Sequence, residues 1–220
     1  MIVADEQVSG RGRMQRSWYS PKGKSLSVSI LFDADGAISD AQILVKVTSL
    51  AMLSALNGLY SLKVDVKWPN DLEIGAKKLA GVLAEVLTKG SNIQVVVGVG
   101  VNLSQSAQEL APLVRPATSI ALERPDLGFV SPQELLEAFL NSLSAQFSIA
   151  RSQGGRTRIL EGYRDRCTTL GQSVEVQLPS GQVIVGKAID LGDNGELVVD
   201  TGSKRFFVSA GDVERLSIGR

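Results

Sequence analysis

Histidine is absent from the chain, and cysteine occurs once, as Cys167. Without histidine there can be no Ser–His or Cys–His nucleophile pair, and the common zinc sites are excluded as well. A single cysteine cannot form a disulfide within the chain, which favours a reducing compartment such as the cytoplasm. Nothing nearby in the sequence activates Cys167, so we expect a packing or surface residue rather than a nucleophile.

Net charge and long apolar runs are also missing. The 23 basic side chains are balanced by 23 acidic ones, which argues against a nucleic-acid or anionic-lipid partner. We find no apolar run of membrane-spanning length and no signal-peptide layout at the start, so no membrane association is expected. With 44% apolar and 21% charged residues over 220 positions, the sequence is typical of a globular protein with one domain and a smaller second one.

Hydrophobic periodicity predicts strands and helices in the first three quarters of the chain. Strands are expected over 2–4, 26–32, 63–68, 80–87 and 94–101, and helices over 39–58, 131–149 and 158–165. Ser39 and Gln42 form a capping box at the start of the first helix. The Val- and Gly-rich run 94–101 indicates a central strand buried on both faces. For residues 105–127 the pattern is irregular and predicts no element.

The pattern changes from about Leu170. Short alternating runs over 174–178, 183–191, 197–200 and 205–208 are separated by turns, and the Asn194-Gly195 turn is a strong hairpin signal. Four or five short strands in about fifty residues are typical of a small barrel.

An arginine- and glycine-containing stretch lies near the start, from Gly10 to Trp18. If this stretch is extended, Arg11 and Arg13 project to the same side and can converge on one anion. The glycines Gly10 and Gly12 let a ligand approach the backbone closely, and guanidinium groups bind carboxylate or phosphate with paired hydrogen bonds. The stretch alone is compatible with an anion-binding enzyme loop and with a nucleic-acid contact.

Two further motifs place polar groups near strand ends. Lys67-Trp68-Pro69-Asn70-Asp71-Leu72 offers an amide and a carboxylate where a strand stops, although Asn70 and Asp71 could simply cap a turn. Lys77-Lys78-Leu79-Ala80-Gly81 places an ammonium group beside a backbone that a ligand can approach. We expect Lys77 to be a solvated surface charge and Lys78 to be functional.

A glycine-containing motif, Gly98-Val99-Gly100-Val101-Asn102, ends the Val-rich strand. It is neither a complete dinucleotide-binding fingerprint nor a phosphate-binding P-loop. Asn102 could read the edge of a base, or it could cap a turn.

Taken in order, these four motifs resemble those of biotin protein ligases over nearly the whole chain. The resemblance implies an α+β fold of the class II synthetase-like, biotin–lipoate ligase type. Residues 1–168 would form a mixed-sheet catalytic domain with helices, and residues 169–220 an SH3-like β-barrel. Relative to the family, the chain begins inside the conserved fold, without the first strand–helix and its Ser/Thr–Asn element. It also lacks an upstream DNA-binding helix-turn-helix, so a repressor role is not expected.

The resemblance also implies an activity and a set of site residues. The ligase would use ATP and Mg²⁺ to convert biotin into biotinyl-5′-AMP and then transfer biotin to a lysine of a biotin carboxyl carrier protein. Arg13 and Lys78 would be catalytic. The positions that match biotin contacts are Gln7, Gly10, Arg11, Gly12, Arg13, Lys78 and Gly81. The positions that match ATP contacts are Arg11, Arg16, Trp18, Asn70, Asp71 and Asn102. No side chain is assigned directly to the metal, which would arrive with ATP, and Asp71 is the one candidate contact.

The chemistry fits a chain without histidine, because the attacking carboxylate is already ionised and needs positive charge rather than a base. Alternatives are a lipoate-type ligase, an inactive ligase-like binding protein, and a nucleic-acid module. Neutral charge disfavours the last. The expected location is cytoplasmic, and a homodimer is left open.

Overall fold

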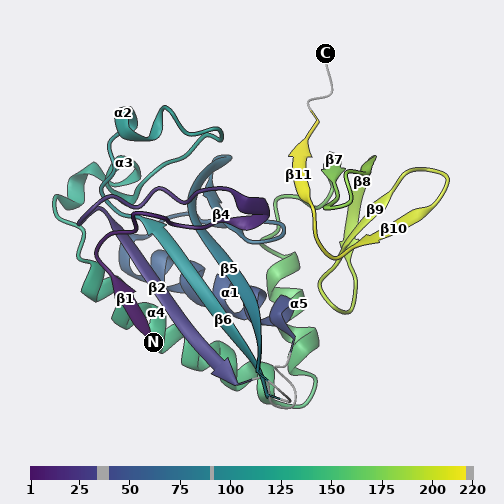
Figure 1. Ribbon diagram of the computed structural model, residues 1–220, viewed down its shortest axis with the longest axis horizontal. Coiled ribbons are helices and arrows are strands. Elements are labelled where there is room, and N and C mark those ends of the chain that lie inside the picture. The colour runs from purple at the N-terminus through teal and green to yellow at the C-terminus, as the bar shows by residue number, and fades with distance from the viewer. Residues whose placement is uncertain (34–39, 90–91, 217–220) are drawn as a thin grey trace.

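The computed structural model describes residues 1–33, 40–89 and 92–216 and contains two β-sheets in that part of the chain (Figure 1). The larger sheet has the order β1-β2-β6-β5-β4-β3 and is antiparallel throughout. Its strands are β1 (Ile2–Ala4), β2 (Ser25–Asp33), β3 (Asp65–Lys67), β4 (Asp71–Ile74), β5 (Lys77–Lys89) and β6 (Asn92–Asn102). The predicted α+β layout of a large sheet with helices is confirmed, but the sheet is not mixed, because every pair of its named strands is antiparallel.

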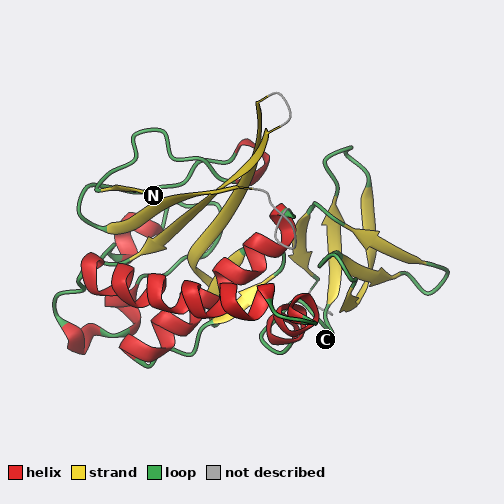
Figure 2. Ribbon diagram, turned by 90° about the horizontal axis from the view of Figure 1, so that it is seen from below, coloured by secondary structure: helices red, strands yellow, loops and turns green. Residues whose placement is uncertain are grey.

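The long helices cover one face of this sheet (Figure 2). The helical segments are α1 (Ala41–Tyr60), α2 (Ala107–Leu110), α3 (Ile120–Glu123), α4 (Pro132–Arg151), α5 (Gly155–Arg164) and the short 3₁₀ turns η1 (Arg13–Gln15) and η3 (Pro125–Leu127). Helix α1 packs on β5 and β6 and is flanked by α4. Among the residues that the structure describes, the other face of the sheet carries the loop of residues 5–24 and no long helix (Figure 1).

Strand β6 is central, as predicted, but it is not buried equally on both faces. Val95, Val97, Val99 and Val101 are buried against the helices. On the open face Gln94, Val96 and Gly98 are only half-buried, whereas Gly100 and Asn102, at the end of the strand, are buried. The prediction of two buried faces was wrong because the sheet is antiparallel with helices on one side, a layout in which one face often remains accessible.

Helix α1 begins one residue later than the capping prediction implies. Asp40 is the N-cap, and its carboxylate accepts from the backbone N–H of Gln42; Ser39 lies outside the described residues. The helix passes Gly58 and ends at Tyr60, where Ser61 adopts a left-handed conformation. Its 20 residues are long and apolar enough to span a membrane, contrary to our expectation for the sequence, but 72% of the apolar window is buried in the protein. These are the features of a core helix.

The C-terminal sheet is a small antiparallel unit of order β10-β9-β8-β7-β11. Its strands are β7 (Ser173–Gln177), β8 (Val183–Leu191), β9 (Leu197–Asp200), β10 (Arg205–Val208) and β11 (Asp212–Arg215). The first four match the predicted runs, and β11 is the additional strand. The buried Trp68 joins the two sheets, because its indole N–H donates to the carbonyl of Gly195 at 3.0 Å. This hydrogen bond connects the C-terminal sheet to the Trp68-Pro69 turn of the larger domain.

The segment between α2 and α3, for which the sequence predicts nothing, runs beside β5. The Lys78 N–H donates to the carbonyl of Pro116, and the Thr118 N–H donates to the carbonyl of Lys78, both at 2.9 Å. These two bonds pair residues 116–118 with the start of β5, through a parallel bridge between Lys78 and Ala117.

Candidate active site

The loop from Gly10 to Trp18 folds back on itself over the open face of the large sheet (Figure 1). The Trp18 N–H donates to the carbonyl of Gly10 at 2.8 Å, and the Gly12 N–H donates to the carbonyl of Arg16 at 2.6 Å. At the tip, Met14 and Gln15 have positive φ angles of 52° and 60°. Few residues other than glycine adopt such angles, so the tip is a tight turn and not the extended stretch that the sequence suggests.

A cleft of about 720 Å³ lies between this loop, the sheet and the barrel. Of the residues assigned to biotin or ATP, all except Gly10 line it: Gln7, Arg11, Gly12, Arg13, Arg16, Trp18, Asn70, Asp71, Lys78, Gly81 and Asn102. Gly10 has a different role. A Cβ there would lie 2.4 Å from the Trp18 carbonyl oxygen and 2.7 Å from Gln7 Oε1, so this glycine allows the loop to close.

Lys78 and Asp71 form an ion pair at the floor of the cleft. Lys78 Nζ lies 2.6 Å from Asp71 Oδ1, and the Lys78 side chain retains 27% exposure toward the cleft. The ammonium also lies 5.4 Å from the centre of the Trp18 ring, a cation–π distance. A Cβ on Gly81 would come within 3.2 Å of Lys78 Nζ, so the glycine leaves room for the pair.

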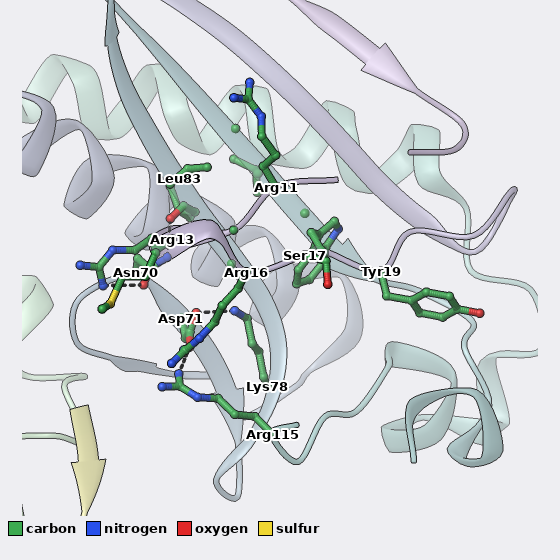
Figure 3. Close-up of a pocket in the computed structure, with 18 of the residues that line it drawn as sticks. Arg11, Arg13, Arg16, Ser17, Tyr19, Asn70, Asp71, Lys78, Leu83 and Arg115 are labelled. Carbon is green, nitrogen blue, oxygen red and sulfur yellow. Dashed lines mark hydrogen bonds and ion pairs between the residues drawn. The ribbon is translucent and has the colours of Figure 1, made fainter. Parts of the chain in front are cut away.

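Arg13 reaches the same cleft from the loop (Figure 3). Its Nη1 donates to Asn70 Oδ1 at 3.5 Å and to the carbonyl of Gly211, in the barrel, at 3.2 Å. Asn70 is fixed in turn, because its Nδ2 donates to the carbonyl of Val82 at 2.7 Å. Burial lowers the pKa of Arg13, although the Asp71 carboxylate opposes the shift. A guanidinium starts from so high a pKa that Arg13 remains a cation at neutral pH.

Arg115 and Asp212 complete the cluster, and the sequence analysis identified neither. Arg115 Nη1 lies 3.4 Å from Asp71 Oδ2, and its Nη2 pairs with Asp212 at the start of β11. Arg16 also pairs with Asp212, with Nη1 3.2 Å from Oδ1. Burial, and then the nearby Arg115, lower the pKa of Arg16. Arg115 belongs to the irregular segment, and Asp212 to a barrel strand that no motif marked, so only the three-dimensional arrangement reveals them.

Arg11 does not join this cluster (Figure 3). Its side chain points away from Arg13 and lies 3.6 Å from Glu85, with 76% exposure. The expected convergence of Arg11 and Arg13 on one anion was therefore wrong for this structure. The tight turn at the loop tip rotates Arg13 toward Asn70, and the two-residue alternation of an extended strand no longer applies.

Trp18 and Asn102 form the remaining wall. A Cβ on Gly100 would lie 2.5 Å from the indole of Trp18, so the glycine allows the ring to lie directly on β6. Asn102 is only 3% exposed; its Nδ2 donates to the Thr118 carbonyl at 2.9 Å, and its Oδ1 accepts from Gln105 at 3.1 Å. These contacts fix the orientation of the Asn102 side-chain amide. A fixed amide is compatible with both expectations for this residue, contact with the edge of a base and a capping role.

The cleft is rich in positive charge. Four cationic groups lie around two carboxylates, Asp71 and Asp212. Within the described ranges, no group of three or more histidine, cysteine or acidic side chains could hold a metal by protein ligands alone. Magnesium in nucleotide sites is commonly bound by one or two carboxylates together with substrate phosphates. Asp71 would have to exchange one of its present partners for the metal, because its two oxygens face Lys78 and Arg115.

Comparison with known families assigns both parts of the chain. Residues 1–102 match the Biotin/lipoate A/B protein ligase family, and residues 169–216 match the Biotin protein ligase C terminal domain. A biotin–[acetyl-CoA-carboxylase] ligase of Mycobacterium tuberculosis is 34% identical over 98% of this chain and 79% of its own length. The Paracoccus denitrificans ligase of the same name is 30% identical, over 96% of this chain and 88% of its own length.

Solved structures agree with the sequence relatives. The biotin protein ligase from Aquifex aeolicus in complex with biotin and ATP superposes with a TM-score of 0.82 and 25% identity, covering 97% of this chain and 88% of that one. The Leishmania major ligase in complex with biotin gives a TM-score of 0.61 at 25% identity, over 99% of this chain and 87% of that one. The resemblance inferred from the four motifs is thus confirmed, and the chain belongs to the biotin protein ligase family.

Proposed function

We propose that this chain activates biotin with ATP to biotinyl-5′-AMP and then transfers biotin to a lysine of a biotin carboxyl carrier protein. The observation that carries the proposal is the gathering of Arg13, Lys78 and Asp71 in one cleft beneath the arginine loop. It is supported by relatives that are named as ligases and by a similar structure that holds biotin and ATP.

The first half-reaction must bring two anions together. A biotin carboxylate attacks the α-phosphorus of ATP, and negative charge accumulates on the phosphate oxygens as the bond forms. Lys78 is held by Asp71 at the floor of the cleft, where an ammonium can contact both the carboxylate and the α-phosphate. Arg13 enters from the opposite wall with its orientation fixed by Asn70. These two groups are the proposed catalytic residues.

The other residues that line the cleft are assigned to one of the two substrates. Gln7, Gly12 and Gly81 would lie along biotin, with Gly10 closing the loop around it. Arg16, Trp18, Asn70 and Asn102 would contact ATP. Mg²⁺, carried in with the nucleotide and contacted by Asp71, would neutralise charge on the phosphates. Arg11 forms an exposed ion pair with Glu85. We propose that Arg11 contacts biotin and ATP after it leaves Glu85.

The second half-reaction requires positioning more than acid–base catalysis. The carrier lysine attacks the acyl carbon, and AMP leaves as a stabilised anion. A histidine-free cleft with fixed cations suits both steps. We further propose that residues 1–168 form the catalytic domain and 169–220 the SH3-like domain, a division supported by the second sheet and by the family match to 169–216. We also propose a cytoplasmic location.

The test is direct. Purified protein is incubated with ATP, Mg²⁺, biotin and a biotin carboxyl carrier domain, and the carrier mass is measured. One added biotin on one lysine is expected, and a carrier with that lysine changed to arginine is the control. The proposal would be withdrawn if neither pyrophosphate release nor transfer depended on biotin. Adding lipoate in place of biotin distinguishes the lipoate-ligase alternative, which predicts the reverse preference.

A further inference from the structure

Arg115 lies in a segment that carries no sequence motif, yet it is held in the cleft by defined contacts. The neighbouring backbone bonds of Pro116 and Thr118 to Lys78 attach this segment to β5. The Arg115 side chain retains 28% exposure, and it lines the cleft. It therefore reaches the site from a fixed backbone and not from a free loop.

The carboxylate of Asp212 lies between two guanidinium groups that come from distant parts of the chain. Arg16 approaches from the N-terminal loop, and Arg115 from the segment before α3. Two guanidinium groups that share one carboxylate are arranged as an anion site, because the same planar donors bind phosphate oxygens in paired hydrogen bonds. In this structure the barrel's own Asp212 supplies the anion.

The charges divide the cleft into two parts. Lys78 pairs with Asp71 and lies near Trp18. The proposed function puts the reacting carboxylate and the α-phosphate in this part of the cleft. Arg16 and Arg115 lie on the side of the barrel, around Asp212, and Arg115 also reaches Asp71 Oδ2 at 3.4 Å, between the two parts. A triphosphate that spans the cleft would thus place its terminal phosphates beside these two arginines.

Resting on the function proposed above, we propose that Arg115, together with Arg16, binds the β- and γ-phosphates of ATP, replacing Asp212 as the partner of both guanidinium groups. When a biotin carboxylate oxygen forms its bond to the α-phosphorus, the bond from that phosphorus to the bridging oxygen breaks. The electron pair leaves on pyrophosphate, where negative charge increases. Arg115 stabilises that developing charge, so it acts on the leaving group, while Lys78 acts on the attacking carboxylate.

The experiment compares Arg115→Ala with Arg166→Ala, a matched change at an exposed arginine that is not among the cleft residues. Four quantities are measured on the full chain: KM for ATP, KM for biotin, inhibition by inorganic pyrophosphate, and inhibition by AMP. Arg115→Ala should raise KM for ATP and weaken pyrophosphate inhibition by about 10- to 100-fold, the loss expected for hydrogen bonds to a charged group. KM for biotin and inhibition by AMP should change less than about twofold, and Arg166→Ala should match the wild type. Arg115→Lys should recover part of the loss, because it restores charge without the paired geometry.

Two results would overturn the inference. One is an unchanged KM for ATP and unchanged pyrophosphate inhibition in Arg115→Ala. The other is an equal loss of AMP and pyrophosphate inhibition, which would mean that Arg115 only supports the fold of the cleft. If the wild-type protein formed no adenylate, the proposed ligase function would fail by itself. Calorimetry of inorganic pyrophosphate binding to wild type and Arg115→Ala would then still test the anion site, and equal affinities would overturn it.

Discussion

The carboxylate of Asp71 lies 2.6 Å from the ammonium of Lys78, and the two side chains come from adjacent antiparallel strands, β4 and β5. The other oxygen of Asp71 faces Arg115 at 3.4 Å. Asp71 is thus a buried anion between two cations, and it fixes the direction of the lysine within the cleft. A carboxylate in this position influences catalysis through the groups it orients.

Asp71→Asn should slow adenylate formation by about 10- to 100-fold, because the amide holds Lys78 less firmly and leaves this lysine without its counter-ion, whereas Arg115 keeps Asp212. The measurement is biotin-dependent pyrophosphate release. Glu123→Gln is the matched control, since Glu123 pairs with the exposed Lys77 at 3.7 Å outside the cleft. Equal effects of the two substitutions would show that the Asp71 pair has no special role.

Gly100→Ala should displace Trp18 from β6, because the added Cβ would lie 2.5 Å from the indole ring. The expected results are a shift in tryptophan fluorescence and a KM for ATP raised by about tenfold or more. Gly98→Ala is the control for fluorescence, because its Cβ would meet no atom closer than 3.8 Å. A wild-type emission spectrum in Gly100→Ala would mean that Trp18 does not rest on this strand.

Lys46 is a buried cation on α1, and it should make stability depend on alkaline pH. Its ammonium donates to Gln42 Oε1 at 3.2 Å and lies 5.5 Å from the centre of the Tyr163 ring. Burial lowers the pKa of Lys46 to about 8, although nearby Asp40 opposes the shift. The unfolded chain keeps this proton up to about pH 10.4, so the charge destabilises the folded state below about pH 8, by about 3 kcal/mol at most.

Lys46→Met should therefore raise the free energy of unfolding at pH 7, and it should remove an increase in wild-type stability between about pH 8 and 10. Urea unfolding at several pH values measures both effects. Lys187→Met, at an exposed position on β8, should change neither. A less stable Lys46→Met protein with the wild-type pH dependence would contradict this explanation.

Cys167 should be unreactive in the folded protein. The side chain is 7% exposed, and burial raises the pKa of its thiol. Reaction with a thiol reagent should be more than about tenfold slower in native buffer than in urea. Rapid labelling of the native protein would show that the thiol is accessible and would contradict the packing role predicted from the sequence.

Sequence patterns predicted the groups whose positions depend on local structure. Lys78 was singled out from its motif, and Asp71 was assigned to the site through the family resemblance; both lie at the start of a strand, β5 and β4 respectively. The valines at alternate positions of β6 likewise identify the buried face. The open face could not be predicted in the same way. Whether Gly98 and Gly100 face a second layer or a cleft depends on the topology of the whole sheet.

Positions set by tertiary structure were missed for physical reasons. Arg115 lies in a segment without periodicity, and it reaches the site only because backbone bonds attach the segment to β5. Asp212 belongs to the barrel, 97 residues along the chain from Arg115 and farther from the other site groups. Arg11 was misplaced because a tight turn with positive φ at Met14 and Gln15 interrupts the extended geometry that the Arg-Gly alternation suggests.

The central claim is that Lys78 brings the biotin carboxylate and the α-phosphate together. Single-turnover formation of biotinyl-5′-AMP in Lys78→Ala, compared with Lys77→Ala, tests it most directly. We predict that Lys78→Ala slows this step by at least about 100-fold, as removal of a transition-state partner does, and that Lys77→Ala stays near the wild-type rate. A wild-type rate in a folded Lys78→Ala protein would contradict the account.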